Sequence, residues 1–416
     1  MNERRTPTPR YNPTPRRSGK AGKNNVLPIA LGAAAAVIVV AVIAAAALPS
    51  ITAYFDEQNA RQAALDAAPA TTVSLVAVGD NLPDEFIGYY ADALAGEPDD
   101  GQYDYSPMYG PIASYIRDAD LAYVDEEVHL GGNDIGPQGY PSFNVTDSMA
   151  DALAATGFDF VATASNHCYD WGPDALAHSV SVLEKQPFAF TGTANSQEQR
   201  DRIVTQERSG ITFALLNYTY GVNAYAPGDF PSYAVNFIDD AQIAADVQRA
   251  HEAADVVLVS MHWGTELLEE ADEEQLRVAQ LLADLDVDVV LGSHPHVIGP
   301  MAWVASSRNP DHRTLVAYSL GNFLADHDAP LAENAVEGML TCDFVRAEAG
   351  GAVTVENVKW VPLVCHSTED RWDFAVYTVE DYPTDLAKQN RALTEIPDPK
   401  AWLLEHSKAV VGAEWF

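Results

Sequence analysis

Histidines follow two strongly apolar runs of this sequence, at the point where each run ends. His262 comes directly after DVVLVSM, and His294 and His296 follow DVDVVLGS in the segment GSHPH. Such runs predict buried strands of an α/β sheet, and ligands collect in the crevice beyond the carboxyl ends of such strands. The imidazoles are therefore expected to converge. Only Pro295 separates His294 from His296, and its fixed φ keeps the two rings within reach of one centre.

Two further strand-like runs also end in polar residues. TTVSLVAVG ends at Asp80, and FDFVATAS ends at Asn166-His167. Asp, Asn and His delivered by four strand ends are donors that suit zinc, manganese or iron. Each residue alone would be an ordinary polar side chain, but together they predict a divalent metal site. Its members are Asp80, Asn166, His262, His294 and His296.

The first residues of the chain predict a membrane anchor. Residues 1–25 carry seven basic residues and one acidic residue among repeated Pro, Thr and Arg, which predicts disorder. Residues 26–48 contain no charge and could span the roughly 30 Å hydrocarbon core as a helix. The basic tail would stay in the cytoplasm and leave the rest outside the cell membrane. A cleavable signal peptide ending near Ala45–Ala47 is the alternative, although the apolar run exceeds the usual length of about 7–15 residues.

Length and charge narrow the class of protein. The chain has 416 residues, enough for one large or two moderate domains. It carries 24 basic and 60 acidic residues, so that 17 basic and 59 acidic residues follow the basic tail, a net charge of −42. A field of this sign repels polyanions and excludes nucleic acid as a partner.

The chain contains three cysteines. In an oxidising compartment, an odd number leaves at least one thiol unpaired. Cys342 and Cys365 lie in consecutive strand-like runs, so we expect that these two could form a disulfide. Cys168 follows His167 and is interpreted as a free thiol or a bystander of the site.

Strands and helices alternate along the chain. Thr146 is expected to cap a helix that stops at Gly157, and Pro173 begins another helix. This alternation, with hairpins near the end, predicts a mixed-sheet α/β sandwich. Further helices are expected near 84–95, 111–118, 239–253 and 269–285, and strands at 72–79, 121–126, 158–164, 202–207, 211–220, 255–261, 288–292, 314–323, 337–348 and 352–364.

Seven segments along the chain form a recognisable series. In order, the segments are GDN at 79–81, ADLAYVDEE at 119–127, YPSFN at 140–144, GFDFVATASNHCYDWG at 157–172, HWGTE at 262–266, GSHPHVI at 292–298 and YSLGNF at 318–323. Together they resemble the CapA family of poly-γ-glutamate capsule synthesis proteins, which is similar to the calcineurin-like metallophosphoesterases. The resemblance covers about residues 72–365 and implies a four-layer α/β/β/α metallophosphoesterase-like sandwich with a dinuclear metal centre.

The resemblance also implies roles for individual residues. His167 would be a general acid or electrostatic helper near the leaving group, and Glu266 and Asn322 would orient imidazoles. Two ions of Mn, Fe or Zn would share a carboxylate of Glu127 or Asp80 and activate a water. The implied metal ligands are Asp80, Glu127, Asn166, His262, His294 and His296.

Two positions depart from the family's usual pattern. Asp125-Glu126-Glu127 stands where the family usually has Asn-Leu-Glu or Asn-Gln-Glu, which adds carboxylates beside the expected bridge. Asp84 stands where relatives often carry a histidine, four residues after the first Asp.

The resulting hypothesis is a single-pass membrane protein whose extracytoplasmic domain makes, anchors or trims a capsule or cell-surface polymer through a metal-dependent hydrolase site. The alternative is a metal-stabilised, non-catalytic scaffold of a membrane polymer-synthesis complex. Candidate partners are the membrane and the membrane subunits of a polymer synthase. The expected organisation is a basic tail (1–25), a transmembrane helix (26–48), a stalk (49–70), the CapA-type domain (71–366) and a C-terminal extension (367–416).

Overall fold

The computed structural model describes residues 70–416, apart from 99, 224, 226–227, 329 and 349. The expected basic tail, the transmembrane helix and nearly all of the stalk therefore lie outside the described residues. Among the residues that are described, no helix is both long and apolar enough to cross a membrane. The described residues all belong to one compact unit.

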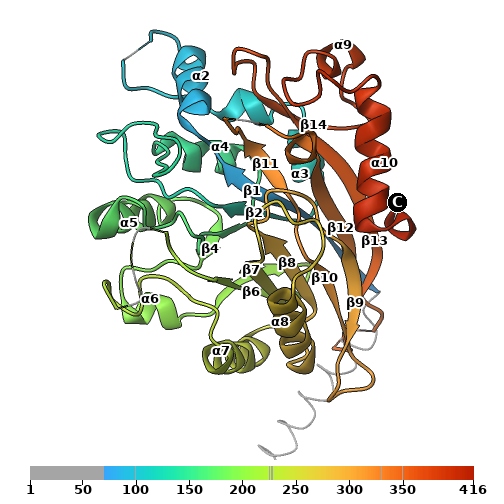
Figure 1. Cartoon of the computed structure of the whole chain (residues 1–416). Coiled ribbons are helices and arrows are strands. Elements are labelled where there is room, and N and C mark those ends of the chain that lie inside the picture. Colours follow the sequence, from blue (N-terminus) through green and yellow to red (C-terminus); the bar gives the residue numbers. More distant parts are fainter. Residues whose placement is uncertain (1–69, 99, 224, 226–227, 329, 349) are drawn as a thin grey trace, which may run out of the picture. The chain divides into compact units, whose positions relative to one another are not determined.

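Two mixed sheets make up this unit (Figure 1). The eight-stranded sheet has the order β14-β13-β12-β1-β2-β3-β4, with β11 beside β1, and its strands run parallel from β1 to β4. The six-stranded sheet has the order β5-β6-β7-β8-β10-β9 and is parallel from β6 to β10. The strands are β1 (Thr71–Leu82), β2 (Leu121–Glu126), β3 (Phe160–Ala162), β4 (Ala189–Thr191), β5 (Val204–Arg208), β6 (Ile211–Thr219), β7 (Val256–His262), β8 (Val289–Ser293), β9 (Met301–Ala305), β10 (Arg313–Ala317), β11 (Asn322–Ala325), β12 (Glu337–Arg346), β13 (Val353–His366) and β14 (Ala375–Thr378).

Apolar side chains alternate along the strands and so build three layers of core. Leu75 and Tyr123 of one sheet meet Leu258 of the other in the core between the sheets. Val78 and Val124 face the opposite way, onto the helices that cover the eight-stranded sheet. A third core joins the six-stranded sheet to α7 and α8. The covering helices are α2 (Glu85–Ala95), α3 (Ala113–Asp118), α4 (Ser148–Thr156), α5 (Gly172–Leu183), α7 (Asp240–Ala253) and α8 (Glu273–Asp284), and the short elements are α6 (Gln197–Asp201), η1 (Ser106–Tyr109) and η2 (Ala332–Ala335).

This layering agrees with the α/β/β/α sandwich that the resemblance implies. The segment after residue 366 packs on the same unit, because β14 pairs with β13, and α10 (Pro399–Val411) buries Leu403 and Val411 in the core between the sheets. Figure 1 shows α10 running along β13. The remaining elements of this segment are α9 (Thr384–Ala387) and η3 (Ala413–Trp415).

Two local predictions were wrong. The run 314–323 was expected to be one strand, but it is divided between β10 and β11, which belong to different sheets. The chain turns at Gly321, whose φ of 72° is a conformation that glycine adopts readily. Thr146 does not cap α4: the N-cap is Asp147, and the Thr146 hydroxyl lies 3.0 Å from the Tyr105 hydroxyl instead.

The expected disulfide between Cys342 and Cys365 is also wrong. All three cysteines are buried free thiols. Cys342 lies opposite Leu75 and faces the core between the sheets, whereas Cys365 lies opposite Val376 and faces the helices on the other side. Although β12 and β13 are neighbours, the pairing of Thr341 with Lys359 puts Cys365 several residues further along the sheet. The two sulfur atoms therefore cannot meet within the geometry that a disulfide needs.

We expect that only glycine fits at position 79, where β1 lies against the backbone of the turn before β11. A Cβ atom at this position would lie 1.8 Å from the carbonyl oxygen of Gly321. Gly79→Ala should therefore lower the free energy of unfolding by about 1–3 kcal/mol, as overpacking does. The measurement is a urea titration of the purified chain. Gly221→Ala is the control, because a Cβ there meets nothing within 4 Å. Equal stability of the two variants would show that β1 and this turn are not in close contact.

Candidate metal centre

Residues from both sheets meet where the parallel strands end. Asp80 lies near the end of β1, Asp125 lies in β2 and His262 is the last residue of β7. His294 follows β8 directly, and its backbone N–H donates to Asp80 Oδ2 at 3.0 Å. The sheets are also tied beside this point, because the hydroxyl of Tyr123 donates to Ser260 Oγ at 2.7 Å. The convergence predicted from the strand ends is therefore present.

The converging side chains form two groups, each with three possible ligand atoms within 4.8 Å of one another. One group is Glu127, His294 and His296, and the other is Asp80, Asp125 and His262. Every member is buried. Since each group supplies both carboxylate oxygen and imidazole nitrogen, each suits a divalent ion such as Mn²⁺, Fe²⁺ or Zn²⁺.

The two groups are interlocked. His262 Nε2 lies 3.7 Å from Glu127 Oε1, and His296 Nδ1 lies 3.3 Å from Asp80 Oδ2. Asn166 lies beside His262, because its side-chain oxygen is 2.8 Å from His262 Nε2. The two groups therefore form one centre, in which histidines of each group lie close to a carboxylate of the other.

Several buried ligand atoms have no hydrogen-bond partner among the described residues, which fits the chemistry of metal binding. They are Asp80 Oδ1, Asp125 Oδ1, both carboxylate oxygens of Glu127, and His294 Nδ1. Buried polar atoms in folded proteins are nearly always paired, because an unpaired one costs free energy. Cations bound between these atoms would satisfy all of them.

Electrostatics within the centre point the same way. Burial, followed by repulsion from Asp125, raises the pKa of Asp80 well above its usual value. Burial also raises the pKa of Asp125 to about 7 and that of Glu127 well above its usual value. Burial lowers the pKa of His262 strongly and that of His296 to about 4, so both imidazoles stay neutral. Neutral imidazoles are the form that binds metals, and a bound cation would supply the countercharge that holds the carboxyls deprotonated.

The GSHPH turn holds its histidines in a costly backbone conformation. His294 has φ 94° and His296 has φ 59°, both in the left-handed region. His294 therefore departs from the extended backbone that the following Pro295 favours. Strain of this kind costs of order 1–3 kcal/mol for each residue and clusters at functional sites.

The other residues expected at the site lie around its edge. His167 Nδ1 lies 2.6 Å from Asp170 Oδ2, which fixes the imidazole, and Asn322 Oδ1 lies 3.1 Å from His296 Nδ1. Asn322 thus contacts an imidazole as expected. Glu266 has no hydrogen bond or ion pair with an imidazole in the described part of the chain, and its side chain is exposed beside the site.

Sequence reasoning missed Asp125, although it noted the extra carboxylates. Residues two apart in a strand face the same side, so Asp125 and Glu127 both point to the centre. Glu126 points the other way and accepts a hydrogen bond from Asn81 Nδ2 at 2.7 Å. This alternation was the signal that could have identified Asp125. Asp84 is not a ligand: it caps α2 and forms an ion pair with Arg371.

Tyr220 and His327 were missed as well. Tyr220 follows β6, its ring centroid lies 4.6 Å from that of His294, and burial raises its phenol pKa to about 12. The phenol therefore stays protonated and can donate a hydrogen bond. The ring of His327 lies 5.7 Å from that of His296. Tyr220 follows the end of β6 directly and His327 lies two residues after the end of β11, which was the available signal, but neither stands in a spacing that indicates chemistry.

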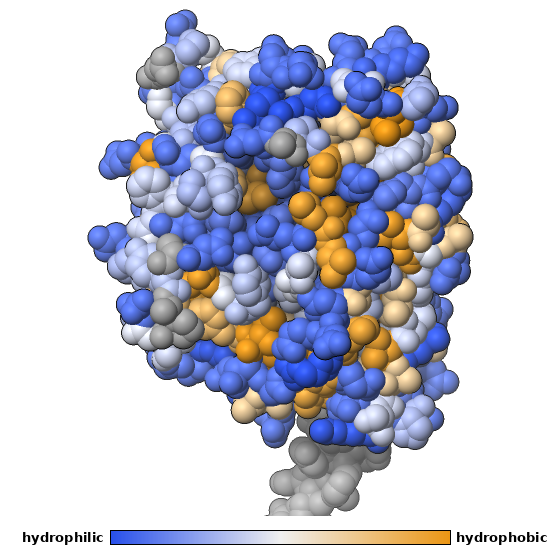
Figure 2. Space-filling view, viewed as in Figure 1, coloured by the Kyte–Doolittle hydropathy of each residue, from blue (hydrophilic) through white to orange (hydrophobic). Residues whose placement is uncertain are grey.

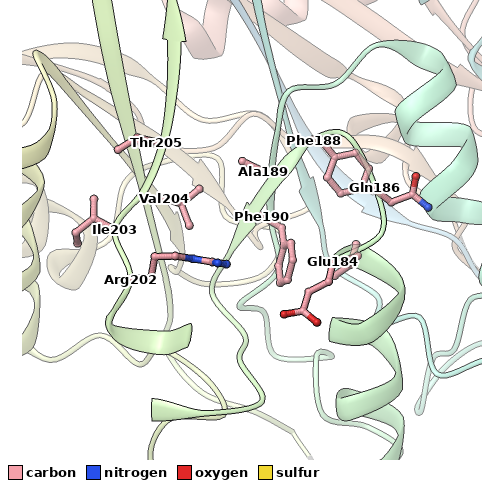
Figure 3. A pocket seen from close by; sticks show the side chains of 10 residues that line it. Glu184, Gln186, Phe188, Ala189, Phe190, Arg202, Ile203, Val204 and Thr205 are labelled. Carbon is pink, nitrogen blue, oxygen red and sulfur yellow. The ribbon is translucent and has the colours of Figure 1, made fainter. Parts of the chain in front are cut away.

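A cleft of about 360 Å³ opens beside the centre and reaches His167, Glu266 and His296. A space-filling view shows a hollow in this face of the molecule, with apolar side chains near it (Figure 2). A larger pocket of about 570 Å³ lies elsewhere, between β4 and β5, where Arg202, Phe190 and Glu184 line it (Figure 3). No residue of either metal-ligating group lines that pocket, whereas His296 lines the cleft. A substrate would therefore approach the metal centre through the cleft.

The pH dependence of stability should differ between the metal-free and the metal-loaded protein. Because the pKa of Asp80 and that of Glu127 are raised in the metal-free fold, the folded protein holds these protons to a higher pH than the unfolded chain does. Stability should then fall as pH rises, by at most about 1.4 kcal/mol per pH unit for each such group. The histidines of the centre are neutral in the fold and partly protonated in the unfolded chain at about pH 6.5, so they add the same pH dependence with and without metal and do not affect the comparison.

In the metal-loaded protein the same carboxyls are already deprotonated, so a higher pH should not lower stability. Urea titrations at about pH 6.5 and about pH 8, with chelator or with Mn²⁺, measure both slopes. Identical slopes in the two conditions would contradict a metal centre at these carboxylates.

Comparisons with known proteins agree with the motifs. The chain is 27% identical over 210 residues to the PGA biosynthesis protein CapA of Bacillus subtilis (strain 168), which covers 49% of this chain and 48% of that protein. It is 26% identical over 186 residues to the capsule biosynthesis protein CapA of Bacillus anthracis, covering 43% of each. The chain thus matches about half the length of these curated relatives.

Among solved structures, a phosphatase from Mycoplasma pneumoniae matches with a TM-score of 0.44, 11% identity and coverage of 71% of this chain and 94% of that one. Another is the calcineurin-like phosphoesterase YfkN of Bacillus subtilis, with a TM-score of 0.40, 14% identity and coverage of 82% and 100%. Residues 74–327, more than half of the sequence, match the family model described as bacterial capsule synthesis protein PGA_cap. The chain belongs to this family of capsule synthesis proteins.

Proposed function

We propose that this protein is a metal-dependent hydrolase that acts on a phosphoester during the synthesis, anchoring or trimming of a capsule or other cell-surface polymer. The observation that carries the proposal is the pair of buried ligand groups, in which four carboxylate oxygens and one imidazole nitrogen have no hydrogen-bond partner in the described part of the chain. Such a pair, open to a cleft on one side, suits hydrolysis better than a purely structural role.

Different residues of the chain would bind the metal ions, protonate the leaving group and stabilise the phosphoryl oxygens. Bound metal ions would polarise the phosphoryl group and supply a hydroxide at neutral pH. Asp170 fixes His167 through Nδ1, while Nε2 lies 3.3 Å from Asn223 Nδ2. With substrate bound, Nε2 would exchange this contact for the leaving oxygen and give it a proton. The Tyr220 phenol, beside His294, would donate a hydrogen bond to a phosphoryl oxygen.

A second candidate function is a metal-stabilised scaffold of a membrane polymer-synthesis complex. One observation favours it: Asp84, at the position where relatives often carry a histidine, is committed to Arg371 and to capping α2. That arrangement leaves one fewer imidazole beside the centre. The scaffold hypothesis predicts metal binding without turnover.

The proposal includes a location. We infer from the uncharged run 26–48 and the basic residues before it that the chain is anchored in the cell membrane, with the N-terminus inside and the C-terminal domain outside. The metal centre would then work on the outer side, where surface polymers are assembled.

Hydrolysis should depend on the centre. The purified chain should release phosphate from p-nitrophenyl phosphate only with added Mn²⁺, and His262→Ala should lower kcat/KM by about a hundredfold or more, because it removes a metal ligand. Tyr220→Phe should lower kcat by about tenfold or more while metal content stays constant. His178→Ala is the control, since that imidazole is exposed and pairs only with Asp147. Stoichiometric metal with no cleavage of any monoester or diester would favour the scaffold.

Topology is tested separately. Protease added to intact cells should degrade the domain beyond residue 70 and spare a tag fused at Met1, because only the basic tail would be inside. Immunoblots against both ends read the result. A domain that resists protease until the cells are lysed would overturn the extracytoplasmic location.

A further inference from the structure

Three large apolar side chains are exposed at the mouth of the cleft beside the metal centre. Tyr140 is 80% exposed, Leu267 is 52% exposed and Leu331 is 48% exposed, and all three line the cleft. Leaving such side chains in water forgoes the stabilisation that burial would give. Apolar surface gathered at the entrance of a polar site is typical of a place where ligands bind.

Backbone contacts tie two of these side chains to the metal-ligating turn. The Leu267 N–H donates to the carbonyl oxygen of Pro295 at 2.8 Å, and Leu267 has φ 63°, a strained conformation for leucine. The Leu331 N–H donates to the side-chain oxygen of Asn334 at 3.3 Å, and Asn334 Nδ2 donates to the carbonyl oxygen of His296 at 3.1 Å. The apolar rim is therefore held at a fixed place relative to the centre.

The loop of Tyr140 is tied to the other side of the cleft. Phe143 donates its backbone N–H to Asp170 Oδ2 at 2.9 Å, and its ring lies edge-on to His167 at 4.6 Å between centroids. The side chain that would protonate a leaving group thus has an aromatic neighbour. A leaving group that reaches His167 must pass through this apolar mouth.

Charges in the cleft disfavour an anionic leaving group. Asp84, Asp326 and Asp328 all pair with Arg371, and Arg391 also pairs with Asp326, so that two cations face three carboxylates. Glu266 remains without a hydrogen bond or ion pair in the described part of the chain and would repel a carboxylate or a second phosphate. An uncharged apolar group would not be repelled by Glu266, and it has no charge whose hydration would be lost on entering the cleft.

We propose, building on the proposed hydrolase function, that the substrate of this site is a phosphoester of an aliphatic alcohol, whose apolar chain lies against Tyr140, Leu267 and Leu331. In the reaction, water oxygen bonds to phosphorus, the bond between phosphorus and the alkoxy oxygen breaks, and His167 gives the departing oxygen its proton. The products are inorganic phosphate, or a phosphomonoester, and the free alcohol. The polyanionic strand of a surface polymer is not the group that occupies the cleft.

The test measures binding, which needs no turnover. Linear alkylphosphonates from methyl to octyl, which cannot be hydrolysed, are titrated calorimetrically into the full-length chain loaded with Mn²⁺. The Kd should tighten by roughly two- to fourfold per methylene until the chain leaves the cleft, as burial of apolar surface requires. A phosphonate with a terminal carboxylate should bind more weakly than its uncharged analogue of equal length, and Glu266→Gln should narrow that difference.

Variants separate the apolar rim from general effects. Leu267→Asn and Leu331→Asn should flatten the dependence on chain length, and asparagine tolerates the left-handed backbone at position 267. Leu276→Asn is the matched control, because Leu276 is 51% exposed on α8 and does not line the cleft. It should leave the dependence on chain length intact.

The outcomes distinguish the two proposals. The apolar-substrate proposal is supported if the Kd tightens with alkyl chain length in the wild-type chain and this dependence is lost in the rim variants. That result would hold even if no ester is hydrolysed and the hydrolase proposal fails. A Kd that does not change with chain length, a change that survives in both rim variants, or no binding of any phosphonate would overturn the apolar-substrate proposal. Hydrolysis of small esters would leave the hydrolase proposal standing in each of those cases.

Discussion

Carboxylates that no arginine or lysine neutralises are buried where strands of the two sheets end. Asp80, Asp125 and Glu127 are fully buried, and in the described part of the chain the only basic side chains that pair with them are histidines. An uncompensated charge in such a place costs several kcal/mol, so these groups either hold protons or bind cations. The raised pKa values describe the first state, and the unpartnered ligand atoms suit the second.

The two sheets and the turn that follows β8 surround these buried carboxylates with imidazoles. Two sheets packed face to face bring the ends of β1 and β2 opposite the ends of β7 and β8, and strained backbone at His294 and His296 completes the ring of donors. The buried carboxylates and the strained backbone destabilise the fold, and packing in the cores between and outside the sheets must offset this cost. A bound cation would offset part of it, because binding free energy becomes folding free energy.

Much of this could be predicted from the sequence because hydrophobic runs and the residues that end them are local signals. The positions of His262, His294 and Asp80 followed from this rule alone, and the helix stop at Gly157 followed from its left-handed conformation. Other features depend on which strands become neighbours. The division of the run 314–323 between two sheets, and the opposite faces of Cys342 and Cys365, come from tertiary pairing that local patterns do not encode.

The central claim is that the two interlocked groups each hold a divalent ion. Elemental analysis of metals in the purified full-length chain, after equilibration with Mn²⁺ and removal of free ions, tests it most directly. The account predicts about two ions per chain, and about one in Asp125→Asn, whose side chain belongs to only one of the groups. A wild-type chain that retains no metal would contradict it, because the buried carboxylates would then be held by protons alone.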